Sequence, residues 1–437
     1  MKIPTHAALC LTAVMMCPPT VHAQDWAVNT VTAMAQTPVL TKDDMGADAD
    51  DPAIWLSGTD RAQSLVITAV KNGGMRVYGL DGTLIQTIAP HKDSRINNVD
   101  VVYGMTMADG TVADLAIASD RGLDYVRAYR IDRDGAELLT EITDPAEERA
   151  FPTRPLRNAE GAEDNPVDDQ ATIYGLTTWH DRNSGTIWVA GTQRHQPVVG
   201  LFRLEATENG VRAVKDHEFA VPTTHMGQDL WEESDDDAAH DFSPQFEGMV
   251  IDRTTGMLYA GQEDVGIWRV PVAGGTAELL YQTRGAKGSS FFNPDSVVTR
   301  DVEGLSLYYA AGGARYLIAS SQGGAHGGAP TYADAPYDDS FAVFSVDEGL
   351  DLLGSFRVGG SDGIDGVQES DGDDVISVAL PGYPNGVFIT QDGYAGDLNG
   401  LDGETAATNF KMVDWAEIAA TFDPPLMVTP EGWDPRG

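Results

Sequence analysis

The most constraining feature of this sequence is a strand–loop–strand pattern that recurs six times from residue 65 onward. In each unit, a short segment rich in β-branched and aromatic residues precedes a polar loop with glycine or an acid, and a second such segment follows. The units begin at residues 65, 114, 186, 256, 315 and 386. One short amphipathic helical stretch is evident, at residues 414–421. The pattern therefore predicts an all-β protein in which each unit is one blade of a propeller.

The spacing of the units, roughly 50–70 residues, accommodates the four strands of a propeller blade and their loops. Six units therefore predict a six-bladed β-propeller with four-stranded antiparallel blades around a central channel. A seven-bladed propeller with one degenerate blade and a large β-sandwich are the alternatives. In a propeller, loops from several blades meet at one end of the channel, so acids that are distant in sequence converge there.

The charge balance limits the possible partners. The 437-residue chain has 28 Lys and Arg against 67 Asp and Glu, a formal charge of −39. Binding to a phosphate backbone needs clustered Lys and Arg, so neither nucleic acid nor an anionic membrane surface is an expected partner. No apolar run is long enough to span a bilayer. No interface is evident in the sequence, and we expect a monomer.

The first 23 residues predict a secretory signal peptide. A positive charge precedes an apolar run at residues 7–16, and Ala23 is a small residue at the expected cleavage position. We therefore expect a secreted or periplasmic protein with a single domain at residues 24–437. Both cysteines, Cys10 and Cys17, lie in the segment that is removed, so the mature chain has no thiolate for a metal site.

Acidic residues gather at the boundaries of the units. They include Asp48, Asp50, Asp51, Asp100, Glu247, Glu263, Asp264, Asp301, Glu303, Asp362, Asp365, Glu369 and Asp371. Converging carboxylates without compensating Lys or Arg repel each other and take up protons or cations. Calcium accepts oxygen ligands in irregular geometry, whereas zinc is disfavoured without thiolates or paired histidines. The alternative is that such acids are turn residues, as we expect for the Asp-Gly pairs that begin at residues 81, 109 and 134.

A few cationic and phenolic groups occupy matching places in the units. Lys71 and Arg121 follow the first strands of units one and two, and Tyr174 precedes unit three. Cations beside acidic clusters indicate a place for an anion. Each of these residues taken alone could equally be an ordinary surface side chain without a functional role. Their recurrence at what we take to be the exits of inner strands favours a functional role.

Taken together, these segments resemble the β-propeller phytases, also called alkaline phytases. The resemblance rests on six segments in the same order, at residues 50–55, 97–100, 246–249, 301–309, 316–323 and 409–415. It implies a calcium-dependent phosphomonoesterase of the 3-phytase type. Such an enzyme hydrolyses phytate (myo-inositol hexakisphosphate) stepwise to lower inositol phosphates, with the substrate bound as its calcium complex.

The resemblance also implies roles for individual residues. The calcium ligands at the cleavage site would be Asp50, Glu247, Glu263, Asp301, Glu303 and Asp371. Further metal ligands would be Asp51, Asp100 and Asp365. Lys71, Arg121 and Tyr174 would hold phosphate oxygens and, with Glu263, form the catalytic group. A water activated by bound calcium would attack phosphorus directly, while Lys71 and Arg121 stabilise the developing charge.

The third unit departs from the family pattern. The family usually has a Gly-Lys-Glu element after this strand, whereas here the segment reads Gly191-Thr192-Gln193-Arg194-His195. We expect Arg194 to replace the lysine as a phosphate-binding residue, and the carboxylate is missing. Gln262 also stands where an acid often precedes Glu263.

Two other functions are compatible with the residues. One is a calcium-dependent lactonase or esterase, since such propellers also line their channel with acids. The other is a non-catalytic propeller that binds a partner with its loops. A histidine-acid phosphatase is rejected, because Arg194-His195-Gln196-Pro197 lacks the glycine and the second arginine of that enzyme's nucleophile segment.

Overall fold

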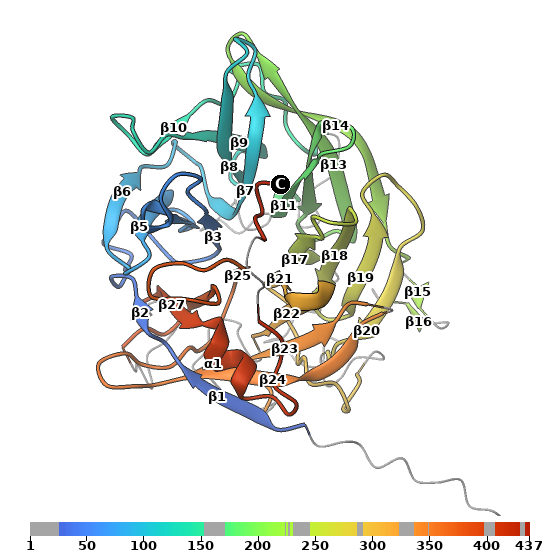
Figure 1. Cartoon of the computed structure of the whole chain (residues 1–437). Helices are drawn as coiled ribbons and strands as arrows, with labels where there is room; N and C mark the ends of the chain where they lie inside the picture. The colour runs from blue at the N-terminus through green and yellow to red at the C-terminus, as the bar shows by residue number, and fades with distance from the viewer. Residues whose placement is uncertain are drawn as a thin grey trace, which may run out of the picture.

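The computed structural model describes residues 26–152, 171–222, 224–225, 228–229, 245–285, 292–322, 336–347, 349–396, 407–428 and 433–437. Six sheets, each with four antiparallel strands, form a ring around a central channel, and one sheet has an added parallel strand (Figure 1). The prediction of a six-bladed β-propeller is therefore confirmed. The expected signal peptide, residues 1–23, lies outside the described residues. No helix in the described ranges is long and apolar enough to cross a membrane.

Blades 1 to 3 each consist of four consecutive strands, and the first strand of each faces the channel. Blade 1 contains β3 (Pro52–Trp55), β4 (Leu65–Ala69), β5 (Met75–Gly79) and β6 (Leu84–Ile88). Blade 2 contains β7 (Ile96–Thr106), β8 (Val112–Asp120), β9 (Tyr125–Ile131) and β10 (Leu139–Glu141). Blade 3 contains β11 (Ile173–Asp181), β12 (Thr186–Gln193), β13 (Val198–Thr207) and β14 (Gly210–Ala220).

Blades 4 to 6 complete the ring. Blade 4 contains β17 (Phe246–Ile251), β18 (Met257–Gln262), β19 (Gly266–Pro271) and β20 (Glu278–Gln282). Blade 5 contains β21 (Leu305–Tyr309), β22 (Arg315–Ser321), β23 (Ser340–Ser345), β24 (Asp351–Gly359) and β1 (Val28–Thr32). Blade 6 contains β25 (Asp373–Ile376), β26 (Val387–Asp392), β27 (Asn409–Asp414) and β2 (Ala35–Gln36). The other elements are the hairpin β15 (Thr224–His225) and β16 (Gln228–Asp229), the 3₁₀ helices η1 (Arg61–Gln63) and η2 (Ala311–Gly313), and helix α1 (Trp415–Ala420).

The N-terminal strands close the ring. β2 pairs antiparallel with β27 and is the outermost strand of blade 6. β1 pairs in parallel with β24 and adds a fifth strand to blade 5. Because the chain continues from β2 into β3, the pairing of β2 with β27 joins blade 6 to blade 1 and closes the ring (Figure 1).

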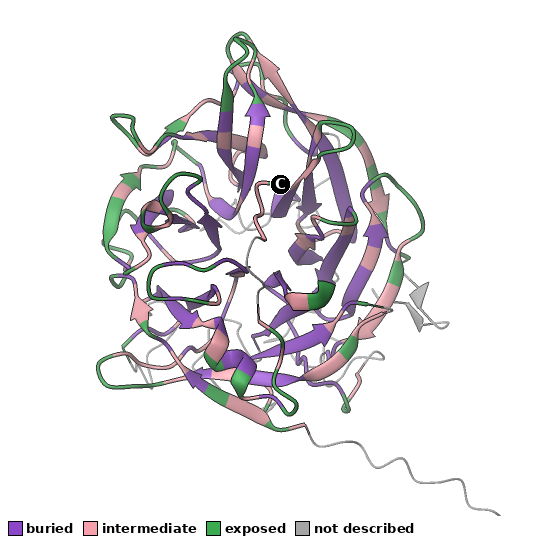
Figure 2. Ribbon diagram, in the orientation of Figure 1, coloured by how far each residue is buried: buried purple, intermediate pink, exposed green. Residues whose placement is uncertain are grey.

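The core lies within and between the blades, and exposed residues concentrate at their outer edges (Figure 2). Between blades 5 and 6, the rings of Phe341, Phe356 and Phe388 pack with centroid distances of 5.0–5.4 Å. Trp415 of α1 stacks on Tyr308 at 3.9 Å. The predicted helix at residues 414–421 is confirmed, and it begins where the Asp414 carboxylate accepts the N–H of residue 416.

The strands recognised in the sequence are the second and third strands of each blade. Lys71 and Arg121 accordingly follow β4 and β8, and our expectation that they follow inner strands was wrong. The second strands are buried along their length and appear in the sequence as clear apolar runs. The inner strands are interrupted near their starts by acids, asparagines and glycines, which hides them from a search for apolar periodicity.

Candidate active site

Three inner strands carry a β-bulge at the same end of the channel. Asn97-Asn98 in β7 lie opposite Ser119, Tyr174-Gly175 in β11 lie opposite Thr192, and Glu247-Gly248 occupy the same place in β17. In the first two bulges, the hydroxyl of the opposing residue accepts a backbone N–H, at 3.0 Å and 2.8 Å. A bulge bends its strand and redirects a side chain. The first residue of each bulge thereby contacts groups from other blades.

The strand register defines two equivalent positions in all six blades. It is set by the pairs Pro52–Thr68, Val99–Ala118, Leu176–Gly191, Met249–Ala260, Leu305–Ala319 and Asp373–Thr390. The residues two positions before the first member of each pair form what we call the first ring: Asp50, Asn97, Tyr174, Glu247, Glu303 and Asp371. The residues three positions after the second member form the second ring: Lys71, Arg121, Arg194, Glu263, Gln322 and Gly393. Most of the predicted site residues belong to these two rings.

The two rings together form what we call the mouth of the channel. Positive and negative side chains lie in different halves of this mouth. In the second ring, blades 1 to 3 contribute Lys71, Arg121 and Arg194. Blades 4 to 6 contribute carboxylates from both rings: Glu247, Glu263, Glu303 and Asp371. The propeller therefore places a cationic half, with three cations, beside an anionic half, with four carboxylates, and Asp50 of blade 1 is the one first-ring carboxylate within the cationic half.

Glu247, Glu263 and Glu303 form a compact cluster of buried carboxylates. One oxygen of each lies within 4.8 Å of the others. Glu247 Oε2 is buried and has no hydrogen-bond partner among the described residues. Burial, with the nearby charges of Asp301 and Glu247, raises the pKa of Glu263 well above its usual value. Burial and the charge of Glu247 do the same to the pKa of Glu303. A cluster of this kind must bind protons or a cation, and its all-oxygen donor set fits a hard cation such as calcium.

Two further predicted ligands flank the cluster. Asp301 is 2% exposed and has a positive φ of 55°, a backbone conformation that is costly for a residue other than glycine. Asp371 accepts a hydrogen bond from Gln322 Nε2 to Oδ1 at 2.5 Å. Burial raises the pKa of Asp371 to about 6, against the opposing effect of Lys71.

Lys71 links the two halves of the mouth. Its Nζ lies 2.9 Å from Asp371, 3.4 Å from Asp48 and 3.6 Å from Asp50. Burial opposes the ammonium charge, but these three carboxylates raise the pKa of Lys71 well above its usual value. Lys71 therefore stays protonated and can donate to an anion. Burial raises the pKa of Asp50, and the charge of Lys71 offsets only part of this increase.

The cationic half is organised around Tyr174. The guanidinium carbons of Arg121 and Arg194 lie 5.3 Å and 5.5 Å from the centre of its ring. Burial and the charges of Glu247 and Glu303 raise the pKa of Tyr174 well above its usual value, so its hydroxyl keeps its proton. Two arginines, a lysine and a phenol therefore present donors on one side of the mouth.

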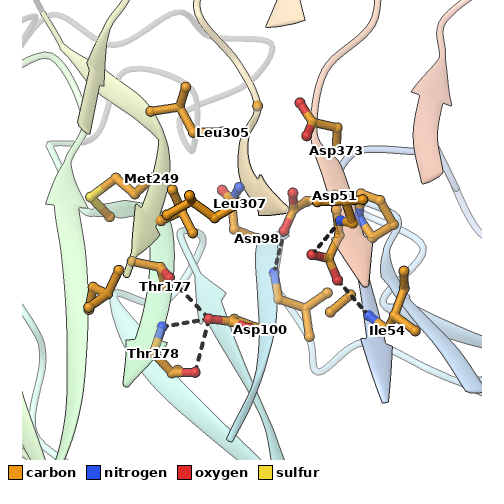
Figure 3. Close-up of a pocket in the computed structure, with 18 of the residues that line it drawn as sticks. Asp51, Ile54, Asn98, Asp100, Thr177, Thr178, Met249, Leu305, Leu307 and Asp373 are labelled. Atoms are coloured by element: carbon orange, nitrogen blue, oxygen red, sulfur yellow. Dashed lines mark hydrogen bonds between the residues drawn. The ribbon is translucent and has the colours of Figure 1, made fainter. Parts of the chain in front are cut away.

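Asp51 and Asp100 lie further along the inner strands. They line a cavity of about 70 Å³ within the channel, which Glu303 of the first ring also lines and which Figure 3 shows with Asp373 on the adjacent strand. Asp51 Oδ2 accepts the N–H of Val99 at 2.9 Å. Asp100 Oδ2 accepts the hydroxyl and backbone N–H of Thr178 at 2.9 Å and 2.6 Å. The structure thus places these two predicted ligands outside the two rings.

Asp365 is separated from the other predicted ligands. It lines a surface groove between blades 5 and 6, where its Oδ1 lies 2.8 Å from Lys411 Nζ. Burial opposes ionisation, but hydrogen bonds from Lys411 and a backbone N–H keep the pKa of Asp365 below its usual value. Asp365 is thus paired with a protein cation, which it shares with Asp392.

Three amides in or beside the rings received no role from the sequence: Asn97, Gln245 and Gln322. Asn97 Nδ2 donates to Glu247 at 2.6 Å, and Gln245 Nε2 donates to Glu263 at 2.6 Å. Asn97 and Gln322 lie in segments that carry the family resemblance, but only the register shows that both occupy ring positions.

The sequence profile of the phytase family matches residues 1–189 and 235–436. The chain belongs to the phytase family. It is therefore a phosphoric monoester hydrolase that acts on phytate. This phytase is 29% identical over 397 residues to the 3-phytase of Bacillus subtilis (strain 168), an alignment that covers 89% of this chain and 84% of the relative.

Solved structures also share similarity with this phytase. One is a protein of unknown function from Bacteroides thetaiotaomicron, with 10% identity, coverage of 86% of this chain and 76% of that one, and a TM-score of 0.43. Another is the Cps50 β-propeller domain of Myceliophteria thermophila, with 10% identity, coverage of 83% and 82%, and a TM-score of 0.36.

Proposed function

We propose that this chain is a calcium-dependent phytase of the 3-phytase type, which releases phosphate from phytate stepwise by direct attack of water. The observation that carries the proposal is the divided mouth of the channel. Phytate is a polyanion, and a chain with a formal charge of −39 repels it unless local positive charge is supplied. The relative at 29% identity, a 3-phytase, supports the same substrate and bond.

The anionic half would hold the cations. Glu247, Glu263 and Glu303 offer three converging oxygens, and Asp301 and Asp371 flank them. When bound, calcium would supply the positive charge that attracts phosphate oxygens and would acidify the water that attacks phosphorus. The protein's own contribution is to keep these carboxylates buried, close together and short of internal donors.

The cationic half would hold the phosphate groups. Lys71 would keep its proton near neutral pH, because three nearby carboxylates raise its pKa. Arg121 and Arg194 present planar donors that match phosphate oxygens, and the Tyr174 hydroxyl adds a neutral donor. Charge that develops on the phosphoryl oxygens would therefore meet donors that are already in place.

The test is phosphate release from phytate near neutral pH, with millimolar calcium or with a chelator. We expect release in calcium, its loss in chelator, and its return when calcium is restored. Equal release under both conditions would exclude the dependence on calcium. No release under either condition would mean that the altered third-blade segment has changed the substrate, and lactones and other phosphate esters should then be screened.

We also propose that the protein is exported and acts as a monomer. The support is the positive charge, apolar run and Ala23 of the N-terminal segment. Mass spectrometry of the protein recovered from the periplasm or medium should give a mature N-terminus at residue 24. Recovery of uncleaved chain from the cytoplasm would contradict the proposal. Sedimentation of the same material tests the monomer.

A further inference from the structure

Two buried amides lie between the cationic and the anionic halves of the mouth. Asn97 is 0% exposed, and its Oδ1 accepts a hydrogen bond from Arg121 Nη1 at 2.8 Å. Its Nδ2 donates to Glu247 Oε1 at 2.6 Å. The amide thus presents its oxygen to the guanidinium and its nitrogen to the carboxylate.

Gln245, which directly precedes β17 of blade 4, forms a second bridge of this kind, but to a backbone N–H instead of a guanidinium. Its Oε1 accepts the backbone N–H of His195, next to Arg194, at 2.8 Å. Its Nε2 donates to Glu263 Oε1 at 2.6 Å. Gln245 therefore joins the segment that carries Arg194 to the second member of the glutamate cluster.

An amide is suited to this place because it can donate and accept at once without net charge. Arginine and carboxylate form strong, often bidentate pairs when they meet directly. A direct pair between Arg121 and Glu247 would occupy the groups needed for phosphate and for the cation. With Asn97 between them, Glu247 Oε2 keeps no hydrogen-bond partner among the described residues, and Glu247 contributes an oxygen to the cluster.

We propose that Asn97 and Gln245 are positioning residues that act as neutral spacers: each holds one carboxylate oxygen in the cluster and keeps the neighbouring cationic segment from neutralising it. This inference rests on the proposed function, because it assigns the glutamate oxygens to calcium and the cationic groups to phosphate. It predicts that loss of a spacer weakens calcium binding, because the neighbouring protein cation can then pair directly with the glutamate.

The test is a double-mutant cycle on Asn97 and Arg121 in the full chain, with calcium affinity measured by titration calorimetry without substrate. We expect Asn97→Ala to weaken calcium binding by about 10–100-fold, the usual effect of losing a partner of a metal ligand. Arg121→Gln in the wild-type background gives the effect of removing one charge. In the Asn97→Ala background, the same change should raise calcium affinity by at least about tenfold more than it does in the wild-type background. Equal effects in the two backgrounds, or wild-type affinity in Asn97→Ala, would overturn the proposal.

The matched control is Gln86→Ala. Gln86 also uses both ends of its amide, on the backbone N–H and carbonyl of Leu139, but it lies outside both rings. Its loss should leave calcium affinity unchanged. If Asn97→Ala does not fold, as judged by near-ultraviolet circular dichroism in chelator, Gln245→Met serves instead. It should weaken calcium binding by about tenfold, and wild-type affinity in that variant would overturn the proposal.

The outcomes separate this inference from the proposed function. A wild-type chain that binds calcium and shows the coupled cycle, yet releases no phosphate from phytate, would refute the function and retain the spacers. If phosphate release depends on calcium but Arg121→Gln has the same effect on calcium affinity in both backgrounds, only the spacer role is refuted. A wild-type chain that binds no calcium would overturn both.

Discussion

At the scale of single residues, the glutamate cluster brings together more negative charge than its protein neighbours neutralise. We predict that Glu303→Gln lowers phytate turnover in calcium by more than about 100-fold, the upper end of the loss expected for a mere partner of a metal ligand. In chelator, the same variant should have a higher thermal midpoint than the wild type, because one of three close carboxylates is gone. The exposed Asp362 offers the control Asp362→Asn, which should change neither measurement. A fully active Glu303→Gln enzyme would contradict the assignment.

The buried acids of the mouth also make stability depend on pH. Burial raises the pKa of Asp371 to about 6 and the pKa values of Glu263 and Glu303 well above the usual range. The folded state then holds protons that the unfolded state has released, so these groups lose stabilising effect as pH rises through their folded pKa values. In chelator, we predict a thermal midpoint a few degrees higher at pH 6 than at pH 8. Calcium should reduce that difference, because it replaces the protons. A calcium-independent pH profile would exclude this coupling.

At the scale of elements, the bulge in β11 depends on a residue without a side chain. A Cβ on Gly175 would lie 2.0 Å from the backbone oxygen of Glu247, on the neighbouring inner strand. We predict that Gly175→Ala lowers the free energy of unfolding by about 1–3 kcal/mol, because the two strands must separate. It should also weaken calcium binding, since Glu247 moves with its strand. Urea denaturation and calorimetry test the two effects.

Gly349→Ala is the matched control for the bulge. A Cβ at Gly349 would meet nothing within 4 Å. The free energy of unfolding should therefore change by no more than about 0.5 kcal/mol. Equal losses in the two variants would show that the close approach at Gly175 is not the cause.

At the scale of the whole molecule, the ring depends on its N-terminal strands. β2 completes blade 6 and β1 extends blade 5, and Val31 of β1 and Ala33, which follows β1, are buried. A chain that begins at residue 37 should lose about 3 kcal/mol or more of unfolding free energy, from lost burial and strand pairing. A chain that begins at residue 26 should match the mature protein. Denaturant unfolding compares the two, and equal stability would mean that the ring closes without these strands.

The division between what sequence and structure contribute can be followed along blade 1. β4 is recognisable because five successive buried residues form an apolar run, a local property. β3 spans only four residues after two acids, so it does not form a comparable apolar run. The sequence therefore predicted β4 as the first strand of the blade, and Lys71 was wrongly placed after an inner strand. Helix α1 was found because its cap and its apolar face lie within one short segment.

The functional residues divide in the same way. The family resemblance, which rests on residue types and their order along the chain, pointed to the glutamates, Lys71 and the arginines. The roles of Asn97 and Gln245 did not follow, since an amide becomes a spacer only through what lies on either side of it. Asp365 resembled the other acids in sequence, yet it pairs with a lysine from β27 in a different groove.

By itself, then, the sequence determined the class of fold, the number of blades and the kinds of charged group available, because repeated apolar runs and residue chemistry are local properties. Only the tertiary structure decided which acids converge and which are neutralised apart. That outcome depends on strand register and ring closure across hundreds of residues. A shift of one residue in the register would turn each side chain to the opposite face of its sheet.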